Sequence, residues 1–491
     1  MSLVVWFGVW FGSPLVFGLL FTGCLLPRQE PAKSFYVLRF LVAIGVGFGF
    51  FSCLSFFLLL GLAFGREQLL IAESLALMIV FVFFLRNSSP SKKSIPTGRE
   101  RFEPVSAAGV QKAACLCFLA ILAVSVAIFV AHVWRSPHGG FDAFAIWNLR
   151  AKFLFGAPSH WTDALSSGLR WSHLDYPLFI PTVVARGWSL AGGDTIAIPI
   201  LLASLFTFGT VGLVVSGLST LRGASQGFLA GSVLLGTPFF LALGADQVAD
   251  VPIGFFILMS FVLLTLRHRF AGYRYRLTFL AGLAAGFSAW TKNEGLLFLA
   301  STLISLFIIG FMSAEKRISA KTIGCFILGA LPVCLLILFF KTQFAPANYI
   351  FSANTAPAMA TRIGDITRQL AILGAFQREI RNFGGWPLSM TGILIFYLLV
   401  LGLSKQVKFK EEVLLLVLTL SLMLIGYYFV YIIAPDDLTR YSLNRILTQL
   451  WPSTVFAYFM LVRTIEEALT IKETVPAKQF MAISAAPEII P

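Results

Sequence analysis

Long apolar runs follow one another along most of the chain, separated by short polar segments. Each run of about 20 residues is long enough for an α-helix to cross the ~30 Å hydrocarbon core of a bilayer. The alternating ten-residue pattern of a transmembrane β-strand is absent from the sequence. The pattern therefore predicts an all-α polytopic membrane protein with about thirteen transmembrane helices. The predicted spans cover residues 3–26, 35–64, 68–86, 113–134, 196–220, 226–243, 250–266, 277–290, 295–312, 323–341, 386–403, 413–433 and 447–463.

One further apolar stretch, residues 176–192, does not fit this series. It is short, it has Pro177 and Pro181 near its start, and it places Arg186 at its middle. An arginine without a partner at mid-membrane costs several kcal/mol. If this stretch does not cross, the strongly basic loops all fall on one side, as the positive-inside rule requires of cytoplasmic loops. We therefore expect an interfacial or re-entrant helix here, with the N-terminus of the protein outside and its C-terminus inside.

The composition supports a membrane protein. The chain is 58% hydrophobic and 12% charged, whereas a soluble domain carries roughly 25% charged residues. The net charge of +14 would suggest nucleic-acid binding in a soluble protein. Here the basic residues lie between apolar runs, so membrane topology explains them and no nucleic-acid partner is expected. The six cysteines lie in apolar runs without a CxxC pair, so neither a disulfide framework nor a zinc site is expected.

The chain divides into three predicted parts. Residues 1–112 comprise three helices and a polar cytoplasmic linker, residues 113–463 form the main membrane core, and residues 464–491 form a polar, ill-ordered cytoplasmic tail. Residues 3–26 lack a basic leader and a cleavage site, so we interpret them as a retained span. The arginine-rich loop 342–385 is expected to form either an amphipathic helix on the surface or a cap over a groove.

The loops on the non-cytoplasmic side carry the unusual acids and bases of the chain. A large first loop holds Asp142 and Asp175, and three later loops add further ionisable residues. Ionisable groups at helix ends beside a bilayer are functional candidates, and their coincidence in four loops predicts one shared site. These residues are Asp142, Asp175, Asp246, Asp250, Lys292, Glu294, Asp436, Asp437, Arg440 and Arg445.

Several of these residues also have a purely structural explanation. Asp142 precedes an apolar run and could N-cap a helix. Asp246 and Asp250 lie four positions apart, where like charges repel unless a cation or a basic partner compensates them. Lys292 could snorkel to the membrane edge, or it could pair with Asp250 or with a lipid phosphate. The remaining alternatives are lipid head-group binding for Arg150 and Lys152 and an ordinary loop role for His173.

Taken in order, the outer motifs resemble those of the GT-C superfamily of integral-membrane glycosyltransferases. They are most similar to the bacterial branch related to protein mannosyltransferases and aminoarabinose transferases, and the resemblance covers residues 113–463. Many relatives carry two adjacent acids in the first loop, whereas Ala143 follows Asp142 here, which argues against a two-carboxylate metal site in that loop. The motifs are Phe141-Asp142-Ala143-Phe144-Ala145-Ile146-Trp147-Asn148 with Lys152, His173-Leu174-Asp175-Tyr176-Pro177-Leu178, Ala249-Asp250-Val251-Pro252, Trp290-Thr291-Lys292-Asn293-Glu294-Gly295, and Ala434-Pro435-Asp436-Asp437-Leu438 with Asn444-Arg445-Ile446-Leu447.

The resemblance implies transfer of a sugar from a polyprenyl-phosphate donor to a lipid, glycan or protein acceptor, with inversion. It implies that Asp142 is the catalytic general base, which contributes roughly 10²–10⁴-fold. The residues expected to bind the donor phosphate are Lys292, Arg445, Arg150 and Lys152. The sugar and acceptor pocket is expected to contain His173, Asp175, Tyr176, Trp147, Asp250, Glu294 and Asp437. A divalent cation is left open, with Asp246 and Asp250 as its ligands.

The main alternative is a transporter or lipid flippase for a glycolipid. Such a protein would be expected to show polar residues inside its spans and inverted repeats. The sequence instead places its acids and bases at one face and shows no internal repeat. We expect an integral protein of the bacterial inner membrane, in contact with membrane lipids, with its site on the outer face.

Overall fold

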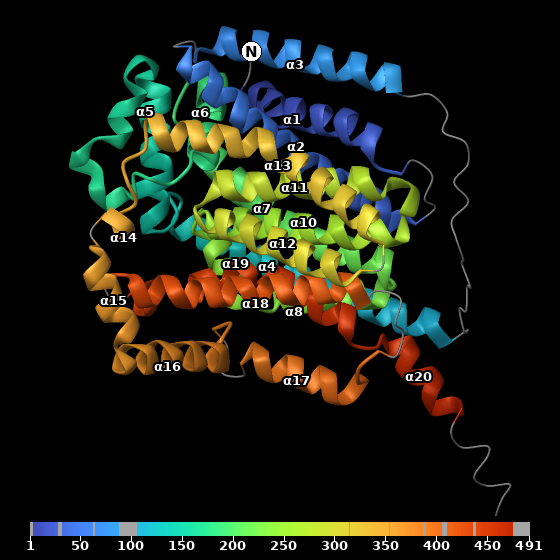
Figure 1. Ribbon diagram of the computed structural model, residues 1–491. Coiled ribbons are helices and arrows are strands. Elements are labelled where there is room, and N and C mark those ends of the chain that lie inside the picture. The colour runs from blue at the N-terminus through green and yellow to red at the C-terminus, as the bar shows by residue number, and fades with distance from the viewer. Residues whose placement is uncertain are drawn as a thin grey trace, which may run out of the picture.

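The computed structural model describes residues 3–27, 32–61, 64–87, 106–313, 315–352, 354–385, 389–404, 410–435 and 438–474. Within these residues every regular element is a helix, and most of the long helices run side by side along one direction (Figure 1). The predicted all-α class is therefore confirmed. Most of the predicted linker and the last part of the predicted tail lie outside the described residues.

The N-terminal helices are α1 (Leu3–Leu25), α2 (Lys33–Leu60), α3 (Arg66–Asn87) and α4 (Ser106–Arg135). The backbones of α1 and α2 approach each other closely at two glycines. A Cβ atom on Gly18 would collide with the carbonyl of Ala43, and one on Gly47 would collide with the carbonyl of Pro14. Small residues permit this approach, which replaces lipid contact with close helix packing.

The first outer loop folds into short elements. They are a π-helix, η1 (Ala143–Trp147), then α5 (Asn148–Gly156), the 3₁₀ segments η2 (Pro158–Leu165) and η3 (Ser167–Ser172), and α6 (Phe179–Ala191). At 1.5 Å per residue α6 is about 20 Å long, too short to cross the bilayer core. Every residue of α6 from Phe179 to Leu190 is buried. The predicted helix over 176–192 thus exists, but it is enclosed by protein and does not lie on the surface.

Arg186 on α6 is compensated by a residue of the N-terminal part that the sequence analysis did not identify. Its guanidinium lies 2.6 Å and 2.8 Å from the two carboxylate oxygens of Glu73 on α3. It also donates to the carbonyl of Trp10 and the hydroxyl of Ser13, both at 2.8 Å. Both side chains of the ion pair are almost completely buried. The charge that marked this stretch as unusual is therefore neutralised inside the helix bundle.

The middle of the chain supplies α7 (Ala197–Leu221), α8 (Ala224–Leu235), α9 (Pro238–Ala245), α10 (Asp250–Arg269), α11 (Arg274–Thr291), α12 (Glu294–Met312) and α13 (Lys316–Gln343). Helices α8 and α9 form one apolar stretch that is bent by 68°. Helix α10 lies at the centre of the bundle, because every residue from Asp250 to Arg267 is buried. It runs from the outer loops at its first residue to the basic loops at its last.

The remaining helices are α14 (Tyr349–Ser352), α15 (Ala356–Gly364), α16 (Ile366–Asn382), α17 (Met390–Leu401), α18 (Lys410–Ile433), α19 (Thr439–Leu461) and α20 (Ile465–Thr474). The arginine-rich loop contains α14 to α16. Arg368 of α16 donates to the carbonyls of Tyr431, Ile432 and Ala434, so it satisfies the C-terminal end of α18. Helix α16 therefore packs against α18 on one side and exposes Ile366 on another.

The start of the predicted tail is ordered, which corrects the sequence analysis. Residues 465–474 form α20, and its acidic first turn is anchored to the main bundle. Arg222 lies 3.2 Å from the carboxylate of Glu467, and Ser225 hydrogen-bonds to Glu466. The polar composition of this segment suggested disorder. Its partners Arg222 and Ser225 are far away in the sequence, so the local pattern does not reveal them.

Within the described part of the chain, nine helices are long and apolar enough to cross a membrane, or ten if the bent pair α8 and α9 is one span. Each of the thirteen predicted runs coincides with a helix or with this bent pair. Helix α17 has 12 residues, and α11 and α19 also fall outside the nine. An integral membrane protein is thus supported, and the number thirteen stays a prediction.

Candidate functional site

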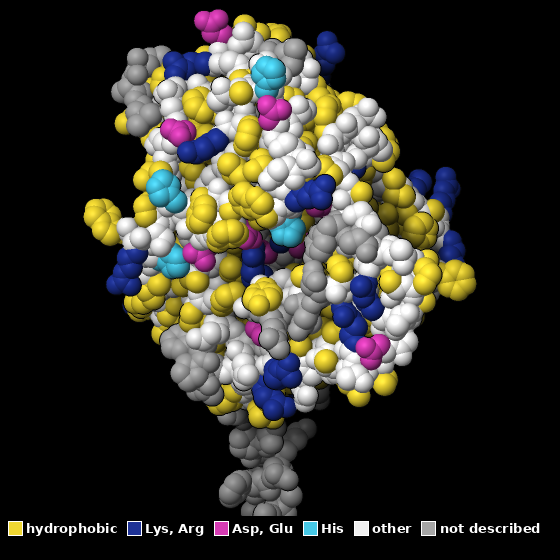
Figure 2. All heavy atoms as spheres, turned by 90° about the vertical axis from the view of Figure 1, so that its left-hand side faces the viewer, with side chains coloured by type: hydrophobic (Ala, Val, Ile, Leu, Met, Phe, Trp, Pro, Cys, Tyr) yellow, Lys and Arg dark blue, Asp and Glu magenta, His cyan; other side chains and the backbone are white. Residues whose placement is uncertain are grey.

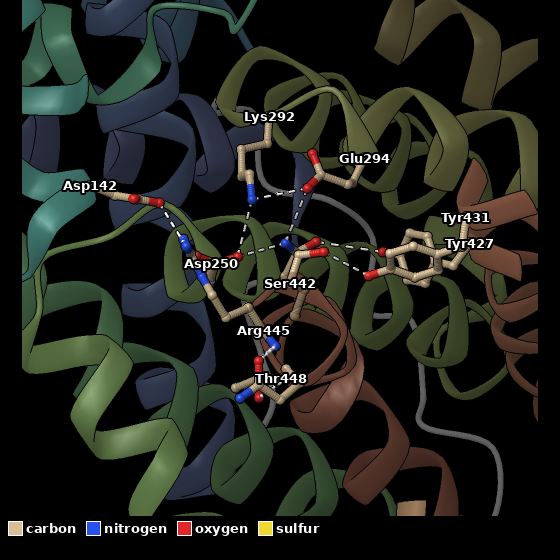
Figure 3. Close-up of polar contacts among 11 residues, drawn as sticks. Asp142, Asp250, Lys292, Glu294, Tyr427, Tyr431, Ser442, Arg445 and Thr448 are labelled. Atoms are coloured by element: carbon tan, nitrogen blue, oxygen red, sulfur yellow. Dashed lines mark hydrogen bonds and ion pairs between the residues drawn. The ribbon is translucent and has the colours of Figure 1, made fainter. Parts of the chain in front are cut away.

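The candidate site is a cluster of acidic and basic side chains where four outer loops meet. Figure 2 views the end of the molecule that faces left in Figure 1, and it shows acidic, basic and histidine side chains together in a recess near the middle of this face. The cluster consists of Asp142, Asp250, Lys292, Glu294 and Arg445, and Figure 3 shows how their side chains converge. Side chains from these loops therefore converge, and their role as one functional site stays a prediction.

Asp250 forms the floor of the cluster. It is the first residue of α10, and its carboxylate is fully buried. One oxygen lies 3.1 Å from Lys292 Nζ and accepts a 2.7 Å hydrogen bond from Gln449 Nε2. The other oxygen lies 2.6 Å from Arg445. A buried carboxylate is tolerated only with such partners, so Asp250 is the anchor that fixes both cations.

Lys292 lies in the short turn between α11 and α12, directly below the first loop. Its ammonium group is 2.9 Å from Glu294 and lies over the ring of Tyr176, 5.5 Å from its centroid. Burial opposes the charged form, but the neighbouring carboxylates of Asp250 and Glu294 prevail and raise the pKa of Lys292. The side chain is therefore a fixed positive charge at physiological pH. The predicted pairing of Lys292 with Asp250 is confirmed.

Asp142 lies at the open edge of the cluster. It directly precedes η1, but its side chain makes no capping hydrogen bond, so the N-cap alternative does not hold. Its carboxylate points instead to Arg445 at 2.7 Å. Asp142 is 22% exposed and Arg445 25% exposed, whereas Asp250 is closed off from solvent. A molecule entering the recess at this end of the bundle would therefore meet Asp142 and Arg445 first.

Two glycines place Asp142 at this edge. Gly139 has φ +74°, which favours glycine, and a Cβ atom on it would collide with the carbonyl of Asp246. The backbone N–H of Gly140 donates to the same carbonyl at 3.0 Å. Gln247 strengthens this junction through a 3.0 Å hydrogen bond to the carbonyl of Pro137. The first loop is thus docked on the turn that precedes α10.

An aromatic stack borders the cluster. The rings of Trp147 and Tyr176 are stacked with centroids 5.6 Å apart, and His173 stacks on Tyr176 at 5.0 Å. Burial raises the pKa of Tyr176 and lowers the pKa of His173. Both therefore present uncharged rings near pH 7. Trp147 and Tyr176 thus lie beside the charged cluster, as the sequence predicted.

Asp175 holds several loop segments together, and its predicted place in the sugar pocket stays a prediction. Its carboxylate accepts hydrogen bonds from Asn293 at 2.6 Å and from Asn348 at 2.7 Å. Lys341 at the end of α13 lies 3.8 Å from the same oxygen and donates to Asn293 at 2.7 Å. Asp175 is buried. It joins the first loop to the α11–α12 turn and to the segment after α13.

Arg150 and Lys152 do not lie where a donor phosphate was expected. Arg150 is completely buried and donates to the backbone carbonyls of Ser172, His173 and Tyr176. Burial lowers its pKa to about 10, so it remains charged at pH 7. Lys152 is exposed and pairs with Asp194 at 3.3 Å. Arg150 is therefore a structural support for the 172–176 segment, and Lys152 belongs to a surface ion pair.

The proposed metal ligands do not share a site. Asp246 is 2.8 Å from His132 of α4, whereas Asp250 is occupied by two cations and an amide. Two cations thus compensate Asp250, whereas the partner of Asp246 is a histidine. Among the described residues there is no group of three or more His, Cys, Asp or Glu side chains arranged to hold a metal. Asp437 and Asp436 lie outside the described residues.

The sequence analysis missed several residues of this site. Gln449 lies four positions after Arg445 on α19, so the two share one face of the helix, and that spacing was a signal that could have identified it. Gln449 is buried and also lies 3.4 Å from Glu294. Lys341 ends a predicted apolar run, which marked it as a second basic residue at the outer edge.

Some buried polar atoms at the site have no hydrogen-bond partner among the residues that the structure describes. They are Glu294 Oε2, Arg445 Nε and Trp147 Nε1. Buried polar groups are normally hydrogen-bonded, and an exception calls for an explanation such as a missing ligand. Glu294 and Arg445 belong to the charged cluster, and Trp147 belongs to its aromatic border.

Fold and site together define a polytopic helical membrane protein with a charged cluster at one end of its bundle. Comparison with known protein families, curated proteins and solved structures gives no match. The resemblance to GT-C glycosyltransferases therefore stays a prediction that rests on the motifs and on the arrangement of their residues.

Proposed function

We propose that this protein is a membrane glycosyltransferase that moves a sugar from a polyprenyl-phosphate donor to an acceptor hydroxyl on the non-cytoplasmic face. The observation that supports this most is the shared position of Arg445, which lies between Asp142 at the open edge and Asp250 in the interior. A carboxylate able to accept a proton thus lies next to cations able to bind a phosphate. Sugar transfer from a phosphate needs both.

The charge balance of the cluster suggests the order of events. Asp142, Asp250 and Glu294 contribute three negative charges, and Lys292 and Arg445 contribute two positive charges. A phosphate gains binding energy here only if it replaces a carboxylate as a partner of the cations. Asp142 is the replaceable one, because it is partly exposed and Arg445 is its only partner among the ion pairs that the described residues form. Asp250 is buried and holds three partners.

This exchange would free the base when the donor arrives. The donor phosphate takes Arg445 as its partner, which releases the carboxylate of Asp142. The acceptor oxygen then attacks the anomeric carbon, Asp142 takes the hydroxyl proton, and the bond from the anomeric carbon to the phosphate oxygen breaks. Its electron pair leaves with the polyprenyl phosphate. Lys292 and Arg445 stabilise the charge that develops there, and direct displacement inverts the anomeric centre.

The aromatic border suits a sugar ring. Tyr176 is half-buried, and its ring lies beside the ammonium group of Lys292. The ring of Trp147 is stacked with the ring of Tyr176. Aromatic faces offer apolar contact, and the unpartnered oxygen of Glu294 and the indole N–H of Trp147 are hydrogen-bonding groups for hydroxyls. In this proposal the membrane is the source of the donor, and the cell envelope supplies the acceptor.

The test uses the full-length protein reconstituted in liposomes with a panel of radiolabelled polyprenyl-phosphate sugars and a membrane extract as acceptor. Label transfer and release of polyprenyl phosphate are measured together. Asp142→Asn should reduce transfer by roughly 10²–10⁴-fold, as expected for loss of a general base. Asp194→Asn removes a carboxylate of an exposed ion pair outside the cluster and should retain activity.

Full transfer by a correctly inserted Asp142→Asn protein would refute the catalytic role. Movement of an intact glycolipid across the bilayer, without cleavage of the sugar–phosphate bond, would instead establish the transporter or flippase alternative.

A further inference from the structure

A second polar cavity lies at the opposite end of the bundle from the charged cluster. Its volume is about 530 Å³, and the C-terminal ends of α10 and α12 line it together with the N-terminal ends of α11, α13 and α18. Asp250 begins α10 in the outer cluster, and Arg267 near the end of the same helix lines this cavity. At 1.5 Å per residue the two are about 26 Å apart. The charge pattern of the sequence places this end in the cytoplasm.

The cavity is lined by charged side chains of both signs. The charged residues of its lining are Arg267, His268, Arg274, Glu315, Glu411 and Glu412. Arg267 and Glu412 are buried, yet Arg267 Nε and Glu412 Oε1 are 3.8 Å apart. The distance from His268 Nδ1 to the same oxygen is also 3.8 Å. Both are ion pairs that are longer than the ~3.2 Å limit of a good hydrogen bond, and the cavity beside them has room for a small polar group.

The mixture of charges selects the kind of ligand. A simple anion would gain from Arg267 and Arg274 but would be repelled by the three glutamates of the lining. A simple cation would meet the reverse problem. A zwitterion with a phosphate and a primary ammonium group satisfies both sets, because guanidinium groups bind phosphate oxygens through paired hydrogen bonds and an ammonium offers three N–H donors to carboxylates.

The walls of the cavity indicate a lipid as the source of that group. Leu306 and Ile309 of α12 line it beside the charged residues. On the same turns of α12, Phe307 and Phe311 are exposed by 57% and 83%. Exposed aromatic and aliphatic side chains beside a polar cavity form the kind of surface along which acyl chains lie while a head group enters the protein.

We propose that this cavity binds the head group of a zwitterionic phospholipid with a primary amine, of the phosphatidylethanolamine type, from the cytoplasmic leaflet. Arg267 and Arg274 hold the phosphate, and Glu411 and Glu412 accept the ammonium. The site is separate from the outer cluster and does not depend on the sugar-transfer proposal.

The experiment measures the thermal midpoint of the delipidated full-length protein in detergent as short-chain lipids are titrated. A ligand that binds only the folded state raises stability with its concentration. Short-chain phosphatidylethanolamine should raise the midpoint. The phosphatidylcholine of the same chain length should require at least about fivefold more lipid for an equal rise, because its quaternary amine has no N–H to donate.

Two variants and a control locate the effect. Arg274→Gln and Glu411→Gln each remove one charge from the lining and should shift the titration to at least fivefold higher lipid. Arg317→Gln changes an exposed residue of α13 outside the lining and should leave the titration unchanged. Because the readout is a titration, a variant with a lower starting midpoint still reports its affinity.

Three results would overturn the proposal. Equal titrations for wild type, Arg274→Gln and Glu411→Gln would show that the lipid binds elsewhere. An equal effect of phosphatidylglycerol would show that only the phosphate is recognised. An equal effect of free phosphoethanolamine would assign the cavity to a soluble ligand and exclude the membrane lipid as the specific source.

Discussion

Arg445 of α19 and Asp142, just before η1, form an ion pair of 2.7 Å although they are far apart in the sequence. The same guanidinium contacts Asp250 at 2.6 Å on its inner side. One arginine therefore connects a partly exposed acid with a fully buried one. The two acids have equal charge but different surroundings, so the structure predicts that they respond differently to substitution.

Replacement of the two acids should separate stability from activity. Asp250→Asn leaves Lys292 and Arg445 short of their buried counter-charge and should destabilise the protein by about 3–5 kcal/mol. Asp142→Asn breaks a pair at the solvent edge and should cost about 1 kcal/mol or less. Thermal unfolding in detergent measures both. Similar losses for the two variants would contradict the division into a buried anchor and an open edge.

The Glu73–Arg186 pair makes a second prediction. Glu73→Gln leaves Arg186 charged and buried without its counter-ion, which should cost about 3–5 kcal/mol. The double variant Glu73→Leu with Arg186→Met removes both charges and should recover most of that loss. Glu67→Gln on the exposed first turn of α3 serves as the control and should stay near wild type. Stability is read from thermal unfolding, and an unaffected Glu73→Gln protein would show that Arg186 has another source of compensation.

Substitution of Arg150 should have a local effect on the first loop. Its planar guanidinium donates to three carbonyls of the 172–176 segment, which a lysine does not reproduce. Arg150→Lys should cost at least about 2 kcal/mol, since each hydrogen bond from a charged group contributes roughly 1.5–3 kcal/mol. Hydrogen exchange of residues 172–176 should increase in this variant. Arg170→Lys, an exposed change in the same loop, should leave the exchange as it is.

His173 should make the stability of the protein depend on pH. Burial lowers its pKa in the folded protein, whereas the unfolded chain keeps the ordinary value of about 6.5. The unfolded state therefore binds a proton first, and stability falls as the pH drops from about 6.5 towards the folded-state pKa. His173→Asn should remove this component, and asparagine tolerates the positive φ of 52° at this position. Thermal midpoints between pH 7.5 and 5 test it, and equal slopes would refute it.

Much of the arrangement could be predicted from local sequence. The periodic apolar runs located the helices, and ionisable residues at the ends of these runs located the charged cluster. The pairing of Lys292 with Asp250 was foreseen because both residues stand at the same edge of neighbouring helices. The ends of apolar runs can be read directly from the sequence.

The partners of single residues were harder to predict. Arg150 and Asp175 resembled ligand-binding residues because they are charged and lie in the first loop. Their roles as supports depend on which carbonyls and amides fold next to them, and this is decided by tertiary packing. Gln449 was not predicted, because an uncharged side chain inside an apolar run does not indicate a site. Its spacing from Arg445 nevertheless places both residues on one face of the helix.

The buried pair of Glu73 and Arg186 also defines how relatives of this chain can be recognised. Loss of residues 1–112 would leave the arginine of α6 facing lipid or an empty space, so a shorter version of the protein needs an uncharged residue at position 186. Positions 73 and 186 should therefore change together in homologues, so that both residues are charged or both are uncharged. This coupled substitution would distinguish chains that have the same three N-terminal helices from chains that lack them.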